Sequence, residues 1–152
     1  MNPQGAQSYL RTQIFTASPE QLQMMLYDGA IRFAEQARPA LAARQWETSY
    51  TTISKAQKII NELMGNLRRD IAPELCDRLA SLYNYVHRML VDANTKHRIE
   101  SLDEAIKILK YQRETWKMLL GQLGRQKAAE AARKLDVPAP SARMEASISM
   151  HG

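Results

Sequence analysis

Four long segments of the chain carry apolar side chains at intervals of three and four residues, and this repeat constrains the fold more than any other feature. Such spacing gathers apolar side chains on one face of an α-helix, whereas a half-buried strand needs strict alternation. No segment has a convincing strand pattern. We therefore predict an all-α protein whose helices run from Pro19 to about Arg38, from Trp46 to Leu67, from near Pro73 to beyond Ala93, and from Ser101 to Leu123.

The links between these predicted helices are only a few residues long. Short links place consecutive helices side by side in opposite directions. A chain of 152 residues suits one domain with a modest core. We predict an antiparallel up-down four-helix bundle at 18–124. An N-terminal capping segment at 1–17 precedes it, and residues 125–152 follow as a tail that starts helical and becomes flexible near Pro138.

Capping residues mark the start of two predicted helices. Ser18 can accept a hydrogen bond from a first-turn N–H, and Pro19 suits the first helical position, where a missing N–H costs nothing. Gln21 has the spacing of a reciprocal capping box. Ser101 has a glutamate at the same spacing, so we expect it to cap the fourth helix.

Two further residues of the first predicted helix limit how it can pack. The apolar spacing continues through Gly29, so we interpret this glycine as a place where another helix or a ligand approaches closely. Pro39 lacks an N–H and clashes with the preceding turn, and it is expected either to stop the helix or to kink it.

Charge and composition exclude several classes of protein. The 21 basic and 16 acidic side chains give a net charge of +5, but they alternate along most of the chain and do not form the basic face of a nucleic-acid binder. The positive net charge is still compatible with binding to an acidic partner or to an anionic lipid surface. No apolar run reaches the ~18 residues of a membrane span. We see no secretory signal, and the single cysteine, Cys76, favours a reducing cytoplasm.

The residues needed for catalysis do not come together in the sequence. None of the three histidines, His87, His97 and His151, follows a glutamate at the spacing of a di-iron site. There is no Cys-x-x-Cys pair and no glycine-rich phosphate loop. Cys76 has no base close to it in sequence and is expected to be a packing residue. The sequence therefore predicts no enzyme activity, no cofactor and no metal.

Several helices have more apolar side chains than one narrow stripe can hold. Neighbouring apolar residues such as Ile59 and Ile60 diverge by about 100° around a helix, so one of each pair leaves the seam. The chain also has eight methionines, which are common at adaptable binding surfaces. A partner groove and wider helix faces both explain this surplus. Seen alone, four large side chains are expected in the core: Trp46, Tyr50, Ile60 and Leu63.

The order of residues adds a resemblance to this pattern. From Tyr9 to Leu120 the chain resembles the flagellin-specific export chaperones of the FliS family. The similar segments, in order, are Thr16–Glu20, Met25–Arg32, Ile53–Leu63, Leu82–Val86, Ala93–Asn94 and Arg113–Trp116.

The resemblance implies an ATP-independent cytoplasmic chaperone that binds the disordered C-terminal region of flagellin. Such a protein prevents premature polymerisation and delivers its client to the flagellar type III export apparatus. The expected partners are flagellin and an export-gate membrane protein, and a co-chaperone is a further candidate. Helix-in-groove docking would account for client binding. The alternatives are a homo-oligomerising or a nucleic-acid-binding helical bundle.

Two groups of residues are the predicted binding machinery. The apolar segment before the first bundle helix is expected to plug the binding surface in the absence of client, or else to staple the bundle end permanently. It consists of Tyr9, Leu10, Ile14 and Phe15. The predicted flagellin-binding groove consists of Tyr27, Gly29, Ile60, Met64, Tyr83, Val86 and Leu90.

Overall fold

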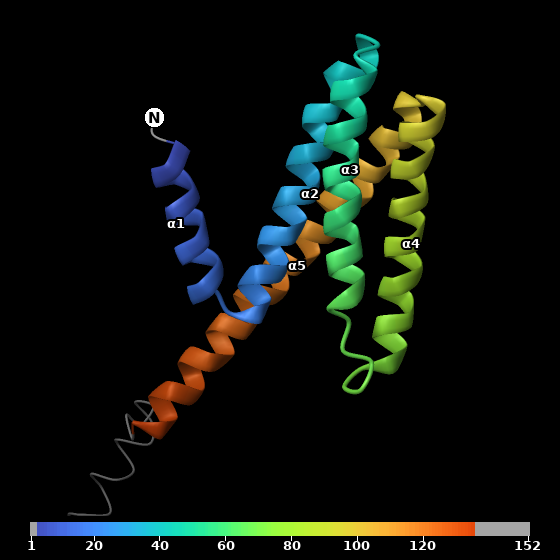
Figure 1. The fold of residues 1–152 in the computed structure, drawn as a ribbon. Coiled ribbons are helices and arrows are strands. Elements are labelled where there is room, and N and C mark those ends of the chain that lie inside the picture. Colours follow the sequence, from blue (N-terminus) through green and yellow to red (C-terminus); the bar gives the residue numbers. More distant parts are fainter. Residues whose placement is uncertain (1–2, 136–152) are drawn as a thin grey trace, which may run out of the picture. The chain divides into compact units, whose positions relative to one another are not determined.

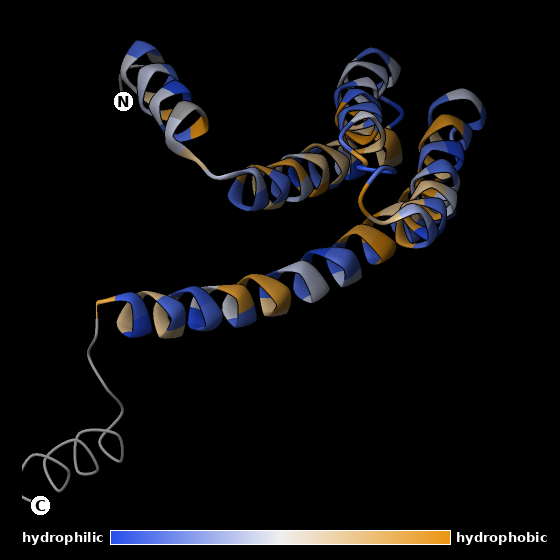
Figure 2. Ribbon diagram, turned by 90° about the horizontal axis from the view of Figure 1, so that it is seen from below, coloured by the Kyte–Doolittle hydropathy of each residue, from blue (hydrophilic) through white to orange (hydrophobic). Residues whose placement is uncertain are grey.

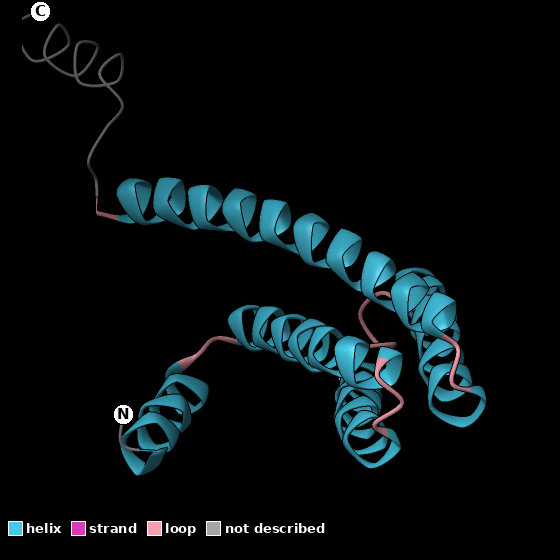
Figure 3. Ribbon diagram, turned by 90° about the horizontal axis from the view of Figure 1, so that it is seen from above, coloured by secondary structure: helices cyan, strands magenta, loops and turns pink. Residues whose placement is uncertain are grey.

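The computed structural model describes residues 3–135, and over this range it contains five helices and no strand (Figures 1 and 3). The all-α prediction is confirmed. The helices are α1 (Pro3–Thr16), α2 (Pro19–Ala42), α3 (Trp46–Gly65), α4 (Pro73–Lys96) and α5 (Ile99–Lys134). None of these helices is long and apolar enough to cross a membrane.

The core is shared by α2, α3, α4 and the first part of α5. Helices α2, α3 and α4 run alternately up and down in Figure 1, and α3 packs against both of its neighbours. From α5, Leu102, Ala105 and Leu109 are fully or almost fully buried in the same cluster. Apolar and polar residues interleave along each helix (Figure 2).

The predicted start of α2 is confirmed in detail. The backbone N–H of Gln21 donates to Ser18 Oγ at 3.2 Å, and the N–H of Ser18 donates to Gln21 Oε1 at 3.1 Å. This is the reciprocal capping box. The helix then passes through Pro39 and ends at Ala42, so Pro39 does not stop it. Burial of Ala37, Ala40 and Leu41 on both sides of the proline keeps this part of α2 helical.

The predicted cap of the last helix is wrong. Helix α5 begins at Ile99, and Ser101 lies inside it. The hydroxyl of Ser101 donates to the carboxylate of Asp92 on α4 at 2.5 Å, so it is engaged with a neighbouring helix. The spacing of a capping box is present in the sequence, but the hydroxyl of Ser101 bonds to another helix and does not cap its own.

Gly29 is a point of close approach, as expected. A Cβ atom at this position would lie 3.1 Å from Cδ1 of Ile59 on α3, tighter than ordinary van der Waals contact. Glycine therefore lets α2 and α3 pack closely.

The core prediction for α3 is half right. Ile60 and Leu63 are fully buried, but Trp46 is 42% exposed and Tyr50 is 62% exposed. The small side chain of Ser49 is buried at the position next to Tyr50, which turns the tyrosine away from the core.

The second of the two units into which the chain divides begins at Lys117. Within it, α5 continues to Lys134, and the side chains up to Leu135 are exposed or half-exposed. The helical character expected at the start of the tail extends through this part. The predicted flexible segment around Pro138 lies outside the described residues.

Candidate functional site

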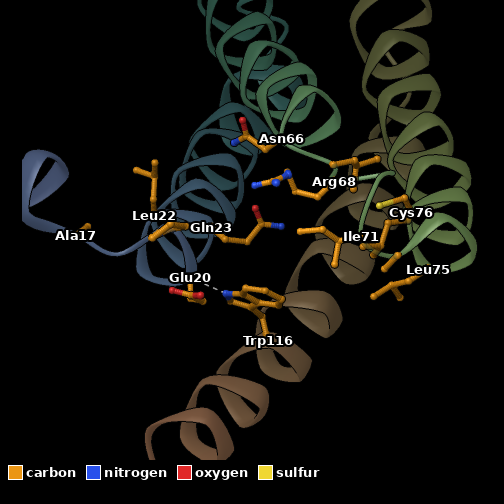
Figure 4. A pocket seen from close by; sticks show the side chains of 14 residues that line it. Ala17, Glu20, Leu22, Gln23, Asn66, Arg68, Ile71, Leu75, Cys76 and Trp116 are labelled. Atoms are coloured by element: carbon orange, nitrogen blue, oxygen red, sulfur yellow. Dashed lines mark hydrogen bonds between the residues drawn. The ribbon is translucent and has the colours of Figure 1, made fainter. Parts of the chain in front are cut away.

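One end of the helical core holds an apolar pocket, which we call the end pocket (Figure 4). Its volume is about 540 Å³. The first turns of α2 and α4, the link 66–72 between α3 and α4, and one residue of α5 form its walls. The residues that matter most below are Glu20, Gln23, Arg68, Ile71, Leu75, Cys76 and Trp116.

The pocket exists because two helices begin here and the link between α3 and α4 is long enough to stand away from them. Pro73 starts α4, so the chain must leave the α conformation just before it. The link therefore carries Ile71 outside any helix, where it is 69% exposed, and Leu75 in the first turn of α4 is 57% exposed. Both side chains offer apolar surface that a partner can bury.

Trp116 ties α5 to the start of α2 beside this pocket. Its indole N–H donates to the backbone carbonyl of Glu20 at 2.9 Å, and the ring is half-buried (Figure 4). An indole that is apolar except for one satisfied donor is a suitable wall for an apolar ligand.

A small polar network lies under the pocket. The amide Nε2 of Gln23 donates to the hydroxyls of Tyr83 at 3.2 Å and Tyr27 at 3.4 Å. The two hydroxyls are themselves 2.5 Å apart. Burial raises the pKa of both tyrosines above the usual 10.0, and for Tyr83 the neighbouring Tyr27 raises the pKa further. Both therefore stay neutral at physiological pH.

Three ion pairs join α2 to α5 along the core. Arg38 contacts Asp103 at 2.7 Å, Lys110 contacts Glu35 at 2.6 Å, and Arg113 pairs with Asp28. The hydrogen bond from Arg38 holds the pKa of Asp103 below its usual value. These side chains are largely solvated, so water and salt screen the pairs and each one contributes little to stability.

The residues predicted to form a groove are core residues in this structure, and none of them lines the end pocket. Five are at most 2% exposed: Tyr27, Ile60, Tyr83, Val86 and Leu90. Gly29 is buried against Ile59, and Met64 packs against the core. Their role in binding flagellin stays a prediction.

The predicted plug residues are not seated on the pocket. Tyr9, Leu10 and Ile14 lie on α1 and are 67%, 47% and 42% exposed. The side chain of Phe15 lies outside the described part of the structure. None of the three described side chains lines the end pocket, and their role stays a prediction.

The residues of the end pocket had a weak signal in the sequence. Leu22, Leu75 and Trp116 lie on the apolar stripes that predict the bundle, so periodicity assigns them to the core. Ile71 was the informative exception, because it is an apolar residue between Asp70 and a helix-starting proline. An apolar side chain in an otherwise polar link is a reason to look for a surface site.

The remaining candidates for chemistry have structural roles. Cys76 is 4% exposed at the pocket wall, which fits the predicted packing role. His97 lies at the C-terminal end of α4 in the left-handed conformation, and its ring stacks on Trp46 at 3.9 Å. Among the described residues, no three side chains are placed to hold a metal ion. His151 lies outside them.

These observations define a class, an all-helical protein with an apolar pocket at one end of its core. Comparison with known proteins then gives the family. The model of the flagellar protein FliS family matches residues 1–123, so the chain belongs to this family. Its members are chaperones and not enzymes.

Two relatives show the extent of the match. The flagellar secretion chaperone FliS of Bacillus subtilis is 34% identical over 119 residues, covering 78% of this chain and 86% of the relative. The protein of the same name from Salmonella typhimurium is 32% identical over 115 residues, covering 75% and 85%. A crystal structure of a bacterial flagellar chaperone superimposes with a TM-score of 0.65 at 20% identity, covering 78% of this chain and 97% of that one, and thus shares the fold.

Proposed function

We propose that this protein is an ATP-independent cytoplasmic chaperone for the C-terminal region of flagellin. In this role it keeps flagellin from polymerising early and passes it to the flagellar type III export apparatus. The observation that carries the proposal is the end pocket, an open apolar site in a member of a family of flagellar secretion chaperones.

The physical basis is the burial of apolar surface on both partners. A disordered client loses conformational freedom when it binds, so a broad apolar contact is needed to compensate. Ile71 and Leu75 present such a surface at the rim, and Trp116 extends it. Each Å² of apolar surface that the client removes from water contributes roughly 25 cal/mol.

Helix α1 is the proposed plug of the empty chaperone. Leu10 and Ile14 are one turn apart and share a face, and both are exposed, as is Tyr9. Such a face can cover an apolar site reversibly and yield to a client with more apolar contact. Delivery is proposed to involve an export-gate membrane protein, and a co-chaperone stays a prediction.

The test is a calorimetric titration of the full chain with the C-terminal region of the flagellin from the same organism. We expect a one-to-one complex, a gain in helical circular dichroism and a negative heat-capacity change. Leu75→Asp should weaken binding at least a hundredfold, because it places a charge in the apolar contact. Leu135→Asp is the matched control, since Leu135 is 76% exposed and lies beyond the family match.

Two outcomes would overturn the proposal. One is the absence of binding by the unaltered protein at micromolar concentration. The other is a stable homodimer that persists when flagellin is added, as the oligomerising alternative requires.

A further inference from the structure

Two cations from different helices share one aromatic ring on the side of the core. The guanidinium carbon of Arg32, on α2, lies 5.3 Å from the centre of the Phe33 ring, and Nζ of Lys55, on α3, lies 5.5 Å from the same centre. The ring is half-buried and both cations are exposed. We call these three residues the seam cluster, because α2 and α3 lie side by side (Figure 1).

The position of Gly29 places the guanidinium of Arg32 at this seam. A Cβ atom at Gly29 would lie 3.1 Å from Cδ1 of Ile59 on α3 and 4.0 Å from Nη2 of Arg32. The guanidinium therefore lies beside the point where the two helices pack closely, on the side of α2 that faces α3.

Neither cation of the seam cluster has an acidic partner among the described residues. Within α2, Arg32 has the spacing to pair with Asp28, four residues before it, and with Glu35, three residues after it. Both carboxylates pair instead with cations of α5. Lys55 has only threonine, lysine and isoleucine at these spacings. The seam cluster therefore carries two positive charges that no carboxylate of the described chain neutralises.

Contact with the ring leaves the hydrogen-bond donors of both cations available. A guanidinium has five N–H donors and an ammonium has three. Among the residues that the structure describes, no acceptor is bonded to those of Arg32 or Lys55. The ring attracts both cations and limits their freedom, so a ligand has less ordering to impose when it binds.

A contact on α4 shows what distinguishes the seam cluster. The guanidinium carbon of Arg88 lies 5.8 Å from the centre of the Tyr85 ring, and this ring has one cation. Single contacts of this kind are common on protein surfaces. Two like charges over one ring repel each other, and a negatively charged ligand between them removes this cost.

We propose that Arg32 and Lys55, held over the Phe33 ring, form a binding site for an oxyanion. The ligand class is a carboxylate or a phosphate, because the planar fork of arginine donates two parallel hydrogen bonds to such groups and lysine adds a further charge. Its two sources are an acidic side chain of flagellin and free phosphate. No residue of the seam cluster lines the end pocket, so the inference goes beyond the proposed function and does not depend on it.

The first arm of the experiment tests free phosphate on the full chain. Melting temperatures are measured in about 100 mM sodium phosphate and in sodium chloride of equal ionic strength, for the unaltered protein, the double variant Arg32→Gln/Lys55→Gln and the control Arg88→Gln. Phosphate stabilises most proteins because it is excluded from their surfaces, so the difference between proteins is the measurement. If phosphate occupies the site, the unaltered protein and the control should gain about 1–2 °C more than the double variant.

The second arm tests the C-terminal region of the flagellin from the same organism. If an acidic side chain occupies the site, the double variant should bind roughly tenfold more weakly at low salt, whereas Arg88→Gln should change binding less than about twofold. The difference should shrink as salt is added, because exposed charges are screened. Flagellin fragments with one acidic residue neutralised at a time identify the partner: that change should weaken the unaltered protein but not the double variant.

A loss in either arm that is specific to the double variant supports the site, and the arm in which it occurs names the source of the oxyanion. If the double variant behaves as Arg88→Gln does in both arms, the inference is overturned. If the unaltered protein does not bind flagellin but its phosphate response depends on Arg32 and Lys55, the chaperone proposal fails and the oxyanion site stands.

Discussion

The two ends of the helical core are built from similar residues but differ in how they are closed. At the end opposite the pocket, which we call the closed end, Trp46 stacks on His97, and Asp92 accepts a hydrogen bond from Ser101. Asp92 also pairs with Lys96 at 3.2 Å. The links 43–45 and 97–98 are short there, whereas the end pocket lies under the longer link 66–72.

The comparison shows that the end with the longer link holds the apolar pocket, whereas the end with short links and polar cross-links is closed. Each end has one tryptophan, and each tryptophan is partly exposed. At the closed end the indole is covered by an imidazole from the next link. At the end pocket the indole N–H is satisfied by Glu20, and the rest of the ring faces a space with apolar walls.

The largest expected effect comes from one substitution made at two places on α4. Leu90→Ala should lower the free energy of unfolding by about 2–5 kcal/mol, because Leu90 is fully buried toward the closed end. Leu75→Ala, at the pocket rim, should lower it by less than about 1 kcal/mol. Urea unfolding measures both. Equal losses would show that Leu75 is a core residue and that the contrast between the ends is false.

A second test uses alkaline pH at the end pocket. The pKa values of Tyr27 and Tyr83 are raised in the folded protein, so the stabilisation is present below the unfolded pKa of 10.0 and decreases as the pH rises above it. Melting temperatures should therefore fall steeply above about pH 10. The Tyr83→Phe variant should show a shallower decrease, and an unchanged slope would contradict the raised pKa.

The two tryptophans provide a third test. Trp116→Phe removes the hydrogen bond to the Glu20 carbonyl and should lower the free energy of unfolding by about 1 kcal/mol. It should also weaken flagellin binding. Trp46→Phe keeps the stacking on His97 and should change stability by less than about 0.5 kcal/mol, with unaltered binding. If Trp46→Phe weakens binding as much as Trp116→Phe does, the client also contacts the closed end.

The smallest effect is expected at acidic pH and concerns the closed end. The hydrogen bond from Ser101, with help from Lys96 and Arg98, holds the pKa of Asp92 below 3.8. A lowered carboxylate pKa stabilises the fold above the unfolded value and loses this effect as the pH falls. Thermal melts should show that Ser101→Ala loses less stability between about pH 5 and pH 2 than the unaltered protein does, because the pKa of Asp92 then lies closer to its unfolded value. Identical acid sensitivity would contradict this role.

Local patterns predicted most of the helical structure. The capping box at Ser18, the proline that starts α4 and the apolar repeats depend on residues close in sequence, so they could be recognised without the fold. The prediction that Ser101 caps the last helix was wrong because its hydrogen-bond partner, Asp92, lies on another helix. The prediction that Tyr50 is a core residue was wrong because periodicity alone does not show that the adjacent Ser49 is the buried residue.

The sequence alone determined that this protein is helical, where most helices begin, and, through its resemblance, the family to which it belongs. These properties reside in short-range spacing and in the order of residues. Only the tertiary structure decided that Tyr27 and Tyr83 are buried beneath the site and that Gln23, Ile71 and Leu75 surround it. An apolar stripe has the same spacing whether a helix or solvent covers it, and the packing of the other helices selects between them.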